Sequence, residues 1–382
     1  MRLTRITAHS FRNLSPDPVF FGSGTTLVAG ENAQGKTNLL EAVALVCGQR
    51  SFRRARPAAM AAGAEGFRVE ACLARGPAVE NLAVAWTPDG GRSFTRAGKV
   101  IGFREASRLA PAVFFSPEHR ELLTGARSPR RRFLDRLALL CRPAAGEDLA
   151  RFERALTQRN ALLSKIREGP GRPAAGELET WTEEFVTSGT AVRRHRRAAL
   201  EEWIADFAPL CHDAGAEYAA IRATYLSEGV TEEDLRAACE RLTGAECRRG
   251  HSLAGPQRDD LFWERDGRPL AETASAGELA RTTALVKLAE WRAIARASGE
   301  TPLFAADEFD AGLSAGWVEA FLEALPPAET VLLTTASEPG RWRPWAGAVV
   351  EMRAGRVLEG PRAVDEQGVW GTDRAPAKMV QG

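Results

Sequence analysis

The chain has 382 residues, of which 51 are basic and 50 acidic, so its formal net charge is +1. A hydrophobic content of 44% and a charged content of 26% exclude a largely disordered or fibrous chain, and the length allows roughly two or three domains. The balanced charge makes no global case for nucleic-acid binding, so any such case must rest on local patches.

The N-terminal part predicts strands around a glycine-rich loop. Residues 3–8 alternate as a strand, and a short apolar strand at 26–29 runs directly into glycine-rich sequence. Leu39, Val43 and Val46 then recur at helical spacing, which predicts a helix with one face against a sheet. Strands at 67–73, 82–87 and 93–96, with a Pro-Asp-Gly-Gly turn between the last two, predict an antiparallel region.

The middle of the chain predicts helices. After an apolar strand at 113–115, Ser116 can cap a short helix that begins at Pro117 and ends at Gly125. Residues 129–247 are mostly helical in pattern, with a break at 169–173 that no regular helix tolerates. A continuous helix over 177–207 would be about 45–50 Å long at 1.5 Å per residue, which predicts an arm rather than a long coiled coil.

Strand and helix alternate again beyond residue 250. Strands are predicted at 260–264, 303–306 and 331–335, and helices at 278–297 and 315–325. This alternation favours a parallel sheet covered by helices, and therefore an α/β protein. We divide the chain into two parts of one head, residues 1–128 and 251–360, an inserted helical arm at 129–250, and a loosely ordered tail at 361–382.

A phosphate-binding loop is predicted between the strand at 26–29 and the helix that follows. The sequence matches GxxxxGK[ST], and its glycines let backbone N–H groups approach phosphate oxygens. The lysine adds a charge at the β/γ-phosphates, and the threonine is placed to bind Mg²⁺. The alternative is an ordinary glycine-rich turn. The predicted nucleotide-binding residues are Gly30, Glu31, Asn32, Ala33, Gln34, Gly35, Lys36, Thr37 and Asn38.

Two carboxylates, Asp307 and Glu308, end the apolar strand at 303–306. The carboxyl ends of parallel strands share one edge of a sheet, so these residues are expected beside the phosphate loop. Asp307 is then placed to hold Mg²⁺, usually through water, and Glu308 to activate the attacking water as a general base. A solvated acidic strand end is the alternative.

A third motif, Ala274-Ser275-Ala276-Gly277-Glu278, opens the helix predicted at 278–297. Ser275 and Glu278 have the spacing of a capping box, in which each side chain pairs with the other residue's backbone N–H. A serine and a glycine at a positive helix end can also contact a γ-phosphate. The two roles are compatible, and the sequence alone does not choose between them.

The chain resembles the RecF family over nearly all of residues 3–360. The matching stretches are FRNL at 11–14, GENAQGKTNLLEA at 30–42, SFR at 51–53, FSP at 115–117, RRFLD at 131–135, QRN at 158–160 and GPQRDDL at 255–261. The resemblance implies an ABC-type ATPase head, a P-loop NTPase with an antiparallel β subregion, into which a mostly helical arm is inserted.

The resemblance also implies an ATP-dependent DNA-binding protein of recombinational repair and replication restart. Such a protein binds double-stranded and gapped DNA as an ATP-induced homodimer, helps to load RecA with RecO and RecR, and is a weak, DNA-stimulated ATPase that uses ATP and Mg²⁺. Lys36, Asp307 and Glu308 would be catalytic, and Thr37 and Asp307 would bind the metal. Ser275 and Gly277 would contact the γ-phosphate held by the other subunit.

Several positions depart from the family pattern. The usual SQGQ reads SAGE at 275–278, which adds a carboxylate near the triphosphate. Ala311 and Ser314 stand where such ABC proteins commonly have a serine and an aspartate, and Gln257 replaces the histidine of GPHRDD. These changes leave ATP binding intact and the rate of hydrolysis open.

Arginine clusters are the candidate DNA contacts, because they can neutralise phosphates without reading sequence. We single out Arg130, Arg131 and Arg132, which adjoin the arm, together with Arg53 and Arg54. A further cluster is Arg193, Arg194, Arg196 and Arg197. Solvated helix faces are the alternative for all of them.

The remaining features bear on compartment and on rival functions. Six scattered cysteines lack the CxxC spacing of a zinc or redox site, and no apolar run approaches the length of a membrane span. With no signal-peptide pattern at the start, we expect a cytoplasmic, nucleoid-associated protein without a membrane partner. The alternative is an ABC-type ATPase in another role, either a transporter-like subunit or a nucleotide-glued DNA-binding module without significant turnover.

Overall fold

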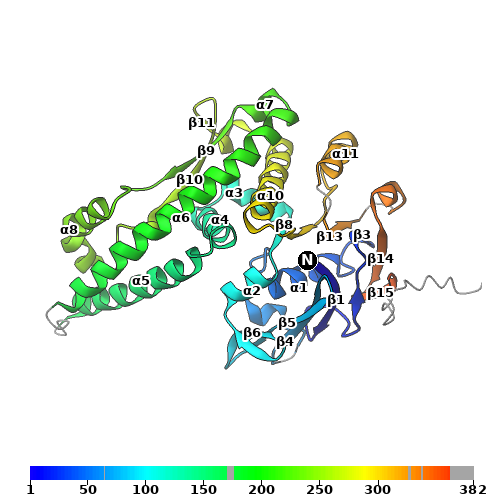
Figure 1. The fold of residues 1–382 in the computed structure, drawn as a ribbon, viewed down its shortest axis with the longest axis horizontal. Coiled ribbons are helices and arrows are strands. Elements are labelled where there is room, and N and C mark those ends of the chain that lie inside the picture. The colour runs from blue at the N-terminus through cyan, green and yellow to red at the C-terminus, as the bar shows by residue number, and fades with distance from the viewer. Residues whose placement is uncertain (64, 170–175, 326–327, 337–338, 362–382) are drawn as a thin grey trace, which may run out of the picture. The chain divides into compact units, whose positions relative to one another are not determined.

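The computed structural model describes residues 1–63, 65–169, 176–325, 328–336 and 339–361. The described part of the chain divides into two compact units, the first formed by Met1–Pro117 and the described residues from Thr301 onward, the second by those of Glu118–Glu300 (Figure 1). Most of the loop predicted at 169–173 and almost all of the tail predicted at 361–382 lie outside the described residues.

A mostly parallel sheet carries the predicted α/β pattern in the first unit. Its strand order is β15-β14-β3-β13-β12-β8, and only the edge strand β15 runs antiparallel to its neighbour. The strands predicted at 26–29, 113–115, 303–306 and 331–335 are thereby confirmed. The bounds are β3 Gly24–Ala29, β8 Ala112–Phe115, β12 Leu303–Ala306, β13 Thr330–Thr335, β14 Ala348–Arg353 and β15 Arg356–Glu359.

A second, antiparallel sheet of the first unit has the order β2-β1-β4-β5-β6-β7. Phe67, Val69, Ala71 and Leu73 are buried and alternate with more exposed residues along β4, so one face of this sheet packs on a core. The predicted antiparallel region is confirmed. The bounds are β1 Arg2–His9, β2 Val19–Phe20, β4 Phe67–Arg75, β5 Ala78–Thr87, β6 Gly91–Arg96 and β7 Lys99–Ile101.

Helix α1, Lys36–Val46, packs against β4 and β5 of the antiparallel sheet and against β13 of the parallel sheet. Every residue from Leu39 to Val46 is buried. The prediction of a single buried face was wrong, because two sheets contact the helix instead of one. The other helical segments of this unit are η1 Pro57–Met60, α2 Phe103–Leu109, α11 Ala315–Ala324, η4 Pro339–Arg341 and η5 Arg343–Trp345.

The second unit is mostly helical and is organised around α6, Glu177–Ala214, which packs against α4, α5, α8 and α10. At 38 residues α6 is roughly 57 Å long. Within the described ranges no helix combines the length and apolar composition needed to cross a membrane. The other helical segments are η2 Pro117–Arg120, α3 Glu121–Thr124, α4 Arg127–Cys141, α5 Ala145–Glu168, α7 Ala216–Ala219, α8 Glu232–Arg249, η3 Pro256–Arg258, α9 Leu270–Thr273 and α10 Ala276–Ser298.

A small antiparallel sheet of the second unit corrects two predictions. β10, Asp260–Arg265, is a strand as predicted, but it pairs with β9, Ile221–Leu226, and β11, Arg268–Pro269, instead of joining the parallel sheet. β9 interrupts the region predicted to be helical. Its side chains alternate between more buried and exposed along the strand, and all six of its residues are in register with β10, which explains why it is extended.

The two compact units have different boundaries from the predicted head and arm. Residues 118–128 and 251–300 were assigned to the head, and they cluster with the helical unit. This includes α10, whose N-terminus carries the SAGE motif. The division into head and arm by function stays a prediction.

Candidate nucleotide-binding site

The loop between β3 and α1 depends on its glycines. Gly30 has φ 148°, and a Cβ added there would clash with the backbone oxygen of Met352 on β14. Gly35, the N-cap of α1, has φ 107°, and its added Cβ would lie 3.2 Å from Asn13 Oδ1. The chain can pass through both points only without a side chain, which leaves the backbone N–H groups accessible to an anion.

Lys36 lies inside the curve of this loop and is only 5% exposed. Its Nζ donates hydrogen bonds of 2.7 Å to the backbone oxygens of Gly30 and Glu31. Burial lowers the pKa of Lys36, while the Asp307 and Glu308 carboxylates act in the opposite direction. An ammonium group held by loop carbonyls, near the start of a helix, fits the phosphate oxygens of a nucleotide.

Thr37 and Asp307 lie side by side, although 270 residues separate them in the sequence. Thr37 Oγ1 donates to Asp307 Oδ1 at 3.1 Å, and the backbone N–H of Asp307 donates to Phe115 O of β8 at 2.9 Å. Hydroxyl and carboxylate oxygens suit Mg²⁺. Thr37 and Asp307 supply two such oxygens, which fits an ion that keeps several waters and also binds substrate phosphate. The described residues contain no cluster of three or more acidic, histidine or cysteine ligands.

A residue that the sequence analysis missed, Thr334, contacts both acidic residues. It is fully buried near the end of β13, where its Oγ1 donates to Asp307 Oδ1 at 2.7 Å and accepts from the backbone N–H of Glu308 at 2.8 Å. Glu308 has φ 47°, in the left-handed region, and an exposed side chain. The sequence signal that could have found it is the pair Thr334-Thr335, which ends the apolar strand β13 next to β12.

Two of the predicted loop residues are tied to the surrounding fold. Gln34 Oε1 accepts from the backbone N–H of Ala354 at 2.6 Å. Asn38 Nδ2 donates to Asn13 Oδ1 at 2.7 Å, and Asn38 Oδ1 accepts from Arg53 Nη1 at 2.9 Å. Gln34 and Asn38 therefore stabilise the loop and its rim, whereas Lys36 and Thr37 face the acidic residues.

The stretches FRNL and SFR meet behind the loop. Arg12 Nε and Nη2 donate to the two carboxylate oxygens of Glu41 at 2.9 and 3.1 Å, and the Ser51 hydroxyl also donates to Glu41. Glu41 is fully buried in α1. A buried carboxylate needs such partners, so these stretches brace the helix that carries Lys36 and Thr37.

In the second unit, Ser275 and Glu278 form the predicted capping box at the start of α10. The backbone N–H of Glu278 donates to Ser275 Oγ at 3.3 Å, and that of Ser275 donates to Glu278 Oε2 at 2.8 Å. Arg265 Nη1 donates to Glu278 Oε1 at 2.6 Å. These hydrogen bonds, above all that of Arg265, lower the pKa of Glu278 to about 2. The Ser275 side chain remains exposed.

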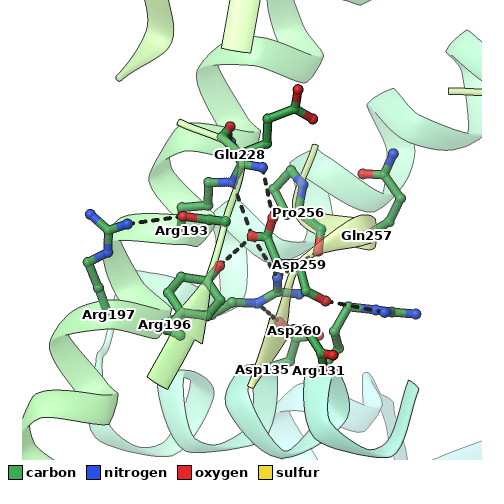
Figure 2. A network of polar contacts seen from close by, with 12 residues as sticks. Arg131, Asp135, Arg193, Arg196, Arg197, Glu228, Pro256, Gln257, Asp259 and Asp260 are labelled. Atoms are coloured by element: carbon green, nitrogen blue, oxygen red, sulfur yellow. Dashed lines mark hydrogen bonds and ion pairs between the residues drawn. The ribbon is translucent and has the colours of Figure 1, made fainter. Parts of the chain in front are cut away.

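The arginine cluster on α6 is partly internal. Arg193 and Arg196 are each only 2% exposed. Arg193 donates to both carboxylate oxygens of Asp259, and Arg196 donates to Asp135 and to the backbone oxygen of Pro256 (Figure 2). These two arginines hold the unit together and are not available to DNA.

The arginines at 130–132 differ in exposure. Arg130 forms a two-point ion pair with Asp260, at 2.7 and 2.9 Å, and Arg131 Nη1 donates to the backbone oxygen of Asp259 at 3.3 Å. Arg132 is exposed, as are Arg53 and Arg54. DNA contact by these five residues stays a prediction.

Curated proteins similar to this chain match it over most of its length. It is 30% identical to the DNA replication and repair protein RecF of Thermosynechococcus vestitus over 374 residues, 94% of this chain and 97% of that protein. It is 34% identical to RecF of Desulforudis audaxviator over 346 residues, 88% of this chain and 94% of that protein. No family model matches the chain.

Solved structures share the fold. The structure of the recombination mediator protein RecF with ATP, from the RecFOR pathway, matches with a TM-score of 0.84 at 24% identity, covering 94% of this chain and 97% of that one. An Smc head domain from Pyrococcus furiosus matches with a TM-score of 0.51 at 16% identity, covering 93% and 95%. The fold is therefore that of an ABC-type ATPase head as found in these proteins.

Proposed function

The chain belongs to the RecF family of DNA replication and repair proteins, and on that premise we propose that it binds and hydrolyses ATP to control its hold on DNA. In this proposal it acts in recombinational repair and replication restart, on double-stranded and gapped DNA, in the cytoplasm and at the nucleoid. RecR is its direct partner, and RecO and RecA follow in the loading of RecA. A related RecF was solved with ATP, which supports the choice of nucleotide.

The single observation that carries the proposal is the contact between Thr37 and Asp307, 3.1 Å apart, beside the buried ammonium of Lys36. Lys36 would bind the β/γ-phosphate oxygens in place of its present carbonyl partners and would stabilise the charge that develops there. Thr37 and Asp307 would hold Mg²⁺, which supplies Lewis-acid polarisation of phosphate oxygens when bound.

Glu308 is the proposed general base. Its left-handed backbone is held by the hydrogen bond to Thr334, and its exposed carboxylate is free to accept a proton from an attacking water. The neighbouring Asp307 is only 3% exposed and already accepts two hydroxyl hydrogen bonds. The two acids thus have different surroundings, which supports metal binding by Asp307 and proton transfer by Glu308.

Gly277 supports the proposed ATP-dependent homodimer. Apart from its chain neighbours and its own helical turn, no described atom lies within 4 Å of a Cβ built at Gly277, and its φ is not positive. Among the described residues, neither packing nor backbone conformation requires a glycine here. Close approach by a phosphate held on a second subunit would require it, with the exposed Ser275 beside it.

The main competing function is a DNA-binding module in which ATP only glues two subunits together. The two proposed functions differ in what they require of Glu308. ATP hydrolysis needs it as a general base, whereas passive ATP binding does not. A transporter-like role for the ATPase head would place the chain with membrane subunits. The relatives named for DNA replication and repair make that role the weaker candidate.

Two substitutions test the proposed function. Lys36→Ala should abolish ATP-stimulated binding to gapped DNA, because the phosphates lose their buried cation, whereas Glu308→Gln should bind ATP, fail to hydrolyse it and prolong the DNA-bound dimer. Gel shift, sedimentation and phosphate release, each with and without ATP, measure these effects. Lys165→Ala, which changes an exposed lysine on α5, is the matched control.

Two results would contradict the proposal. A wild-type chain that stays monomeric with ATP and gapped DNA would remove the ATP-dependent dimer. Equal DNA affinity of Lys36→Ala, Glu308→Gln and Lys165→Ala, with and without ATP, would remove the coupling of nucleotide to DNA binding.

A further inference from the structure

We propose that Arg265 is a positioning residue that makes the SAGE motif of this chain compatible with a triphosphate. The inference rests on the proposed function, because it assumes that Ser275 meets a phosphate held by a second subunit. It addresses a feature of this chain's own sequence, the carboxylate of Glu278 three residues after Ser275.

Arg265 ends β10, and it holds Glu278 in a defined orientation. Its Nη1 donates to Glu278 Oε1 at 2.6 Å, and its Nη2 donates to the backbone oxygen of Thr273, just before the motif. The other oxygen of Glu278 accepts from the backbone N–H of Ser275 at 2.8 Å. Both carboxylate oxygens are therefore engaged, with the side chain folded back onto the start of α10.

This arrangement solves an electrostatic problem. A free carboxylate one helical turn from Ser275 would repel a triphosphate and would compete with it for the positive end of α10. Arg265 balances the charge of Glu278 locally, so the pair adds no net negative charge to the end of the helix that faces the ligand. Like charges placed opposite each other across an interface otherwise cost binding energy.

The hydroxyl group of Ser275 remains suited to its proposed role. In the capping box its Oγ accepts from the backbone N–H of Glu278 at 3.3 Å, so it uses a lone pair and keeps its proton. The Ser275 hydroxyl also helps to lower the pKa of Glu278. The two bonds of the capping box use only the backbone N–H groups and the Ser275 oxygen, so the hydroxyl proton can turn to a phosphate oxygen without breaking the cap.

A purely structural role for Arg265 is the alternative, because its bond to Thr273 O also ties β10 to the segment before α10. The two roles differ in one consequence. If Arg265 acts by neutralising Glu278, removal of the carboxylate makes the arginine dispensable. If it acts only by holding the backbone, the carboxylate is irrelevant and Arg265→Ala stays defective without it.

The test is a double-mutant cycle on ATP-dependent dimerisation, measured by sedimentation with ATP. Arg265→Ala should weaken the dimer by roughly tenfold or more, Glu278→Gln should leave it near wild type, and the double variant should recover most of the loss. Arg265→Lys, which keeps the charge, should lose less than Arg265→Ala. Arg268→Ala removes the exposed cross-strand neighbour of Arg265 and is the matched control.

Binding of a fluorescent ATP analogue to the monomer is the second measurement, and it should be unchanged in all variants, because Lys36 and Thr37 bind that nucleotide. If the wild type dimerises with ATP and Arg265→Ala dimerises equally well, the inference is overturned and the proposed function is not affected. A double variant as defective as Arg265→Ala would show the structural role instead and would also overturn it. If the wild type fails to dimerise with ATP, the proposed function fails, and the inference fails with it.

Discussion

At the scale of single residues, the candidate site depends on a hydroxyl that is not part of any nucleotide-binding motif. Thr334 donates to Asp307 and accepts from the backbone N–H of Glu308, so one side chain orients both acids. The φ of 47° at Glu308 is uncommon for a residue with a side chain, and such a conformation persists only where neighbours hold it. We infer that Thr334 sets the direction in which Glu308 presents its carboxylate.

Replacing Thr334 tests this role. Thr334→Val keeps the shape and removes the hydroxyl, so kcat for ATP should fall about 10- to 100-fold as Glu308 loses its orientation, with little change in nucleotide affinity. Thr334→Ser keeps the hydroxyl and should retain most of the activity. Steady-state kinetics and nucleotide titration measure both.

The control for Thr334 lies at the other end of the same strand. Thr330 is buried in β13, and its hydroxyl accepts from the backbone N–H of Leu3 at 2.9 Å, away from the site. Thr330→Val should lower stability by about 1–3 kcal/mol, because it leaves a buried N–H unpaired, while kcat stays near wild type. A matching loss of kcat in Thr330→Val would mean that destabilisation, not orientation, explains the effect of Thr334→Val.

At the scale of elements, buried ion pairs join the helices and the small sheet of the second unit. Asp259, just before β10, accepts from Arg193 of α6 at 2.7 and 3.0 Å and from the hydroxyl of Tyr225 on β9 (Figure 2). Burial, above all, raises the pKa of Tyr225, so its hydroxyl stays protonated and able to donate. Groups from α6 and β9 thus share one carboxylate that lies just before β10, and these hydrogen bonds tie the three elements together.

Removing that carboxylate should be costly. Asp259→Ala leaves Arg193 buried without a counter-charge, and loss of one partner of a buried pair typically costs about 3–5 kcal/mol. Chemical denaturation should show a large shift of the midpoint. Asp213→Ala, which removes an exposed carboxylate near the end of α6, should stay within about 0.5 kcal/mol of wild type. Similar midpoints for the two variants would contradict the structural role of Asp259.

At the scale of the whole molecule, the structure separates arginines that stabilise the chain from those that can meet DNA. Phosphate contacts release counterions, so each one contributes to the dependence of binding on salt. Arg132 is exposed on α4, whereas the neighbouring Arg130 is committed to Asp260. Two arginines only two positions apart are therefore expected to behave differently.

Salt titrations of DNA binding test this difference. Arg132→Ala should reduce the slope of log K against log salt by about one, with little change in stability. Arg130→Ala should leave the slope unchanged and lower the unfolding midpoint, because Asp260 loses its two-point ion pair and keeps the contact with the exposed Arg127 at 3.3 Å. The reverse pattern, with the slope falling only in Arg130→Ala, would exclude Arg132 from the interface and show that the ion pair opens on DNA.

Much of the fold could be predicted from the sequence because its signals are local. The phosphate loop, its preceding strand and its helix were predicted from glycine, lysine and apolar spacing, each of which acts within a few residues. The strand 303–306 and its two acids were predicted in the same way. The capping box at Ser275 and Glu278 was likewise predicted from residues three apart, and the structure confirms it.

The prediction failed where a segment is decided by a distant partner. β9 was missed and β10 was assigned to the wrong sheet, because pairing between residues 221–226 and 260–265 is not visible in either segment alone. The helix after the phosphate loop was expected to bury one face, and only the presence of two sheets explains why almost all of it is buried.

By itself, then, the sequence determined which backbone segments can form, and it predicted where a phosphate, a metal and a water-activating acid would lie, because short motifs meet those requirements. Only the tertiary structure showed that Thr334 forms hydrogen bonds with both Asp307 and Glu308, that Arg193 and Arg196 are internal, and that Arg265 pairs with Glu278. The physical reason is that charge balance and hydrogen-bond satisfaction are properties of groups brought together in space, and these partners lie between 13 and 66 residues apart in the chain.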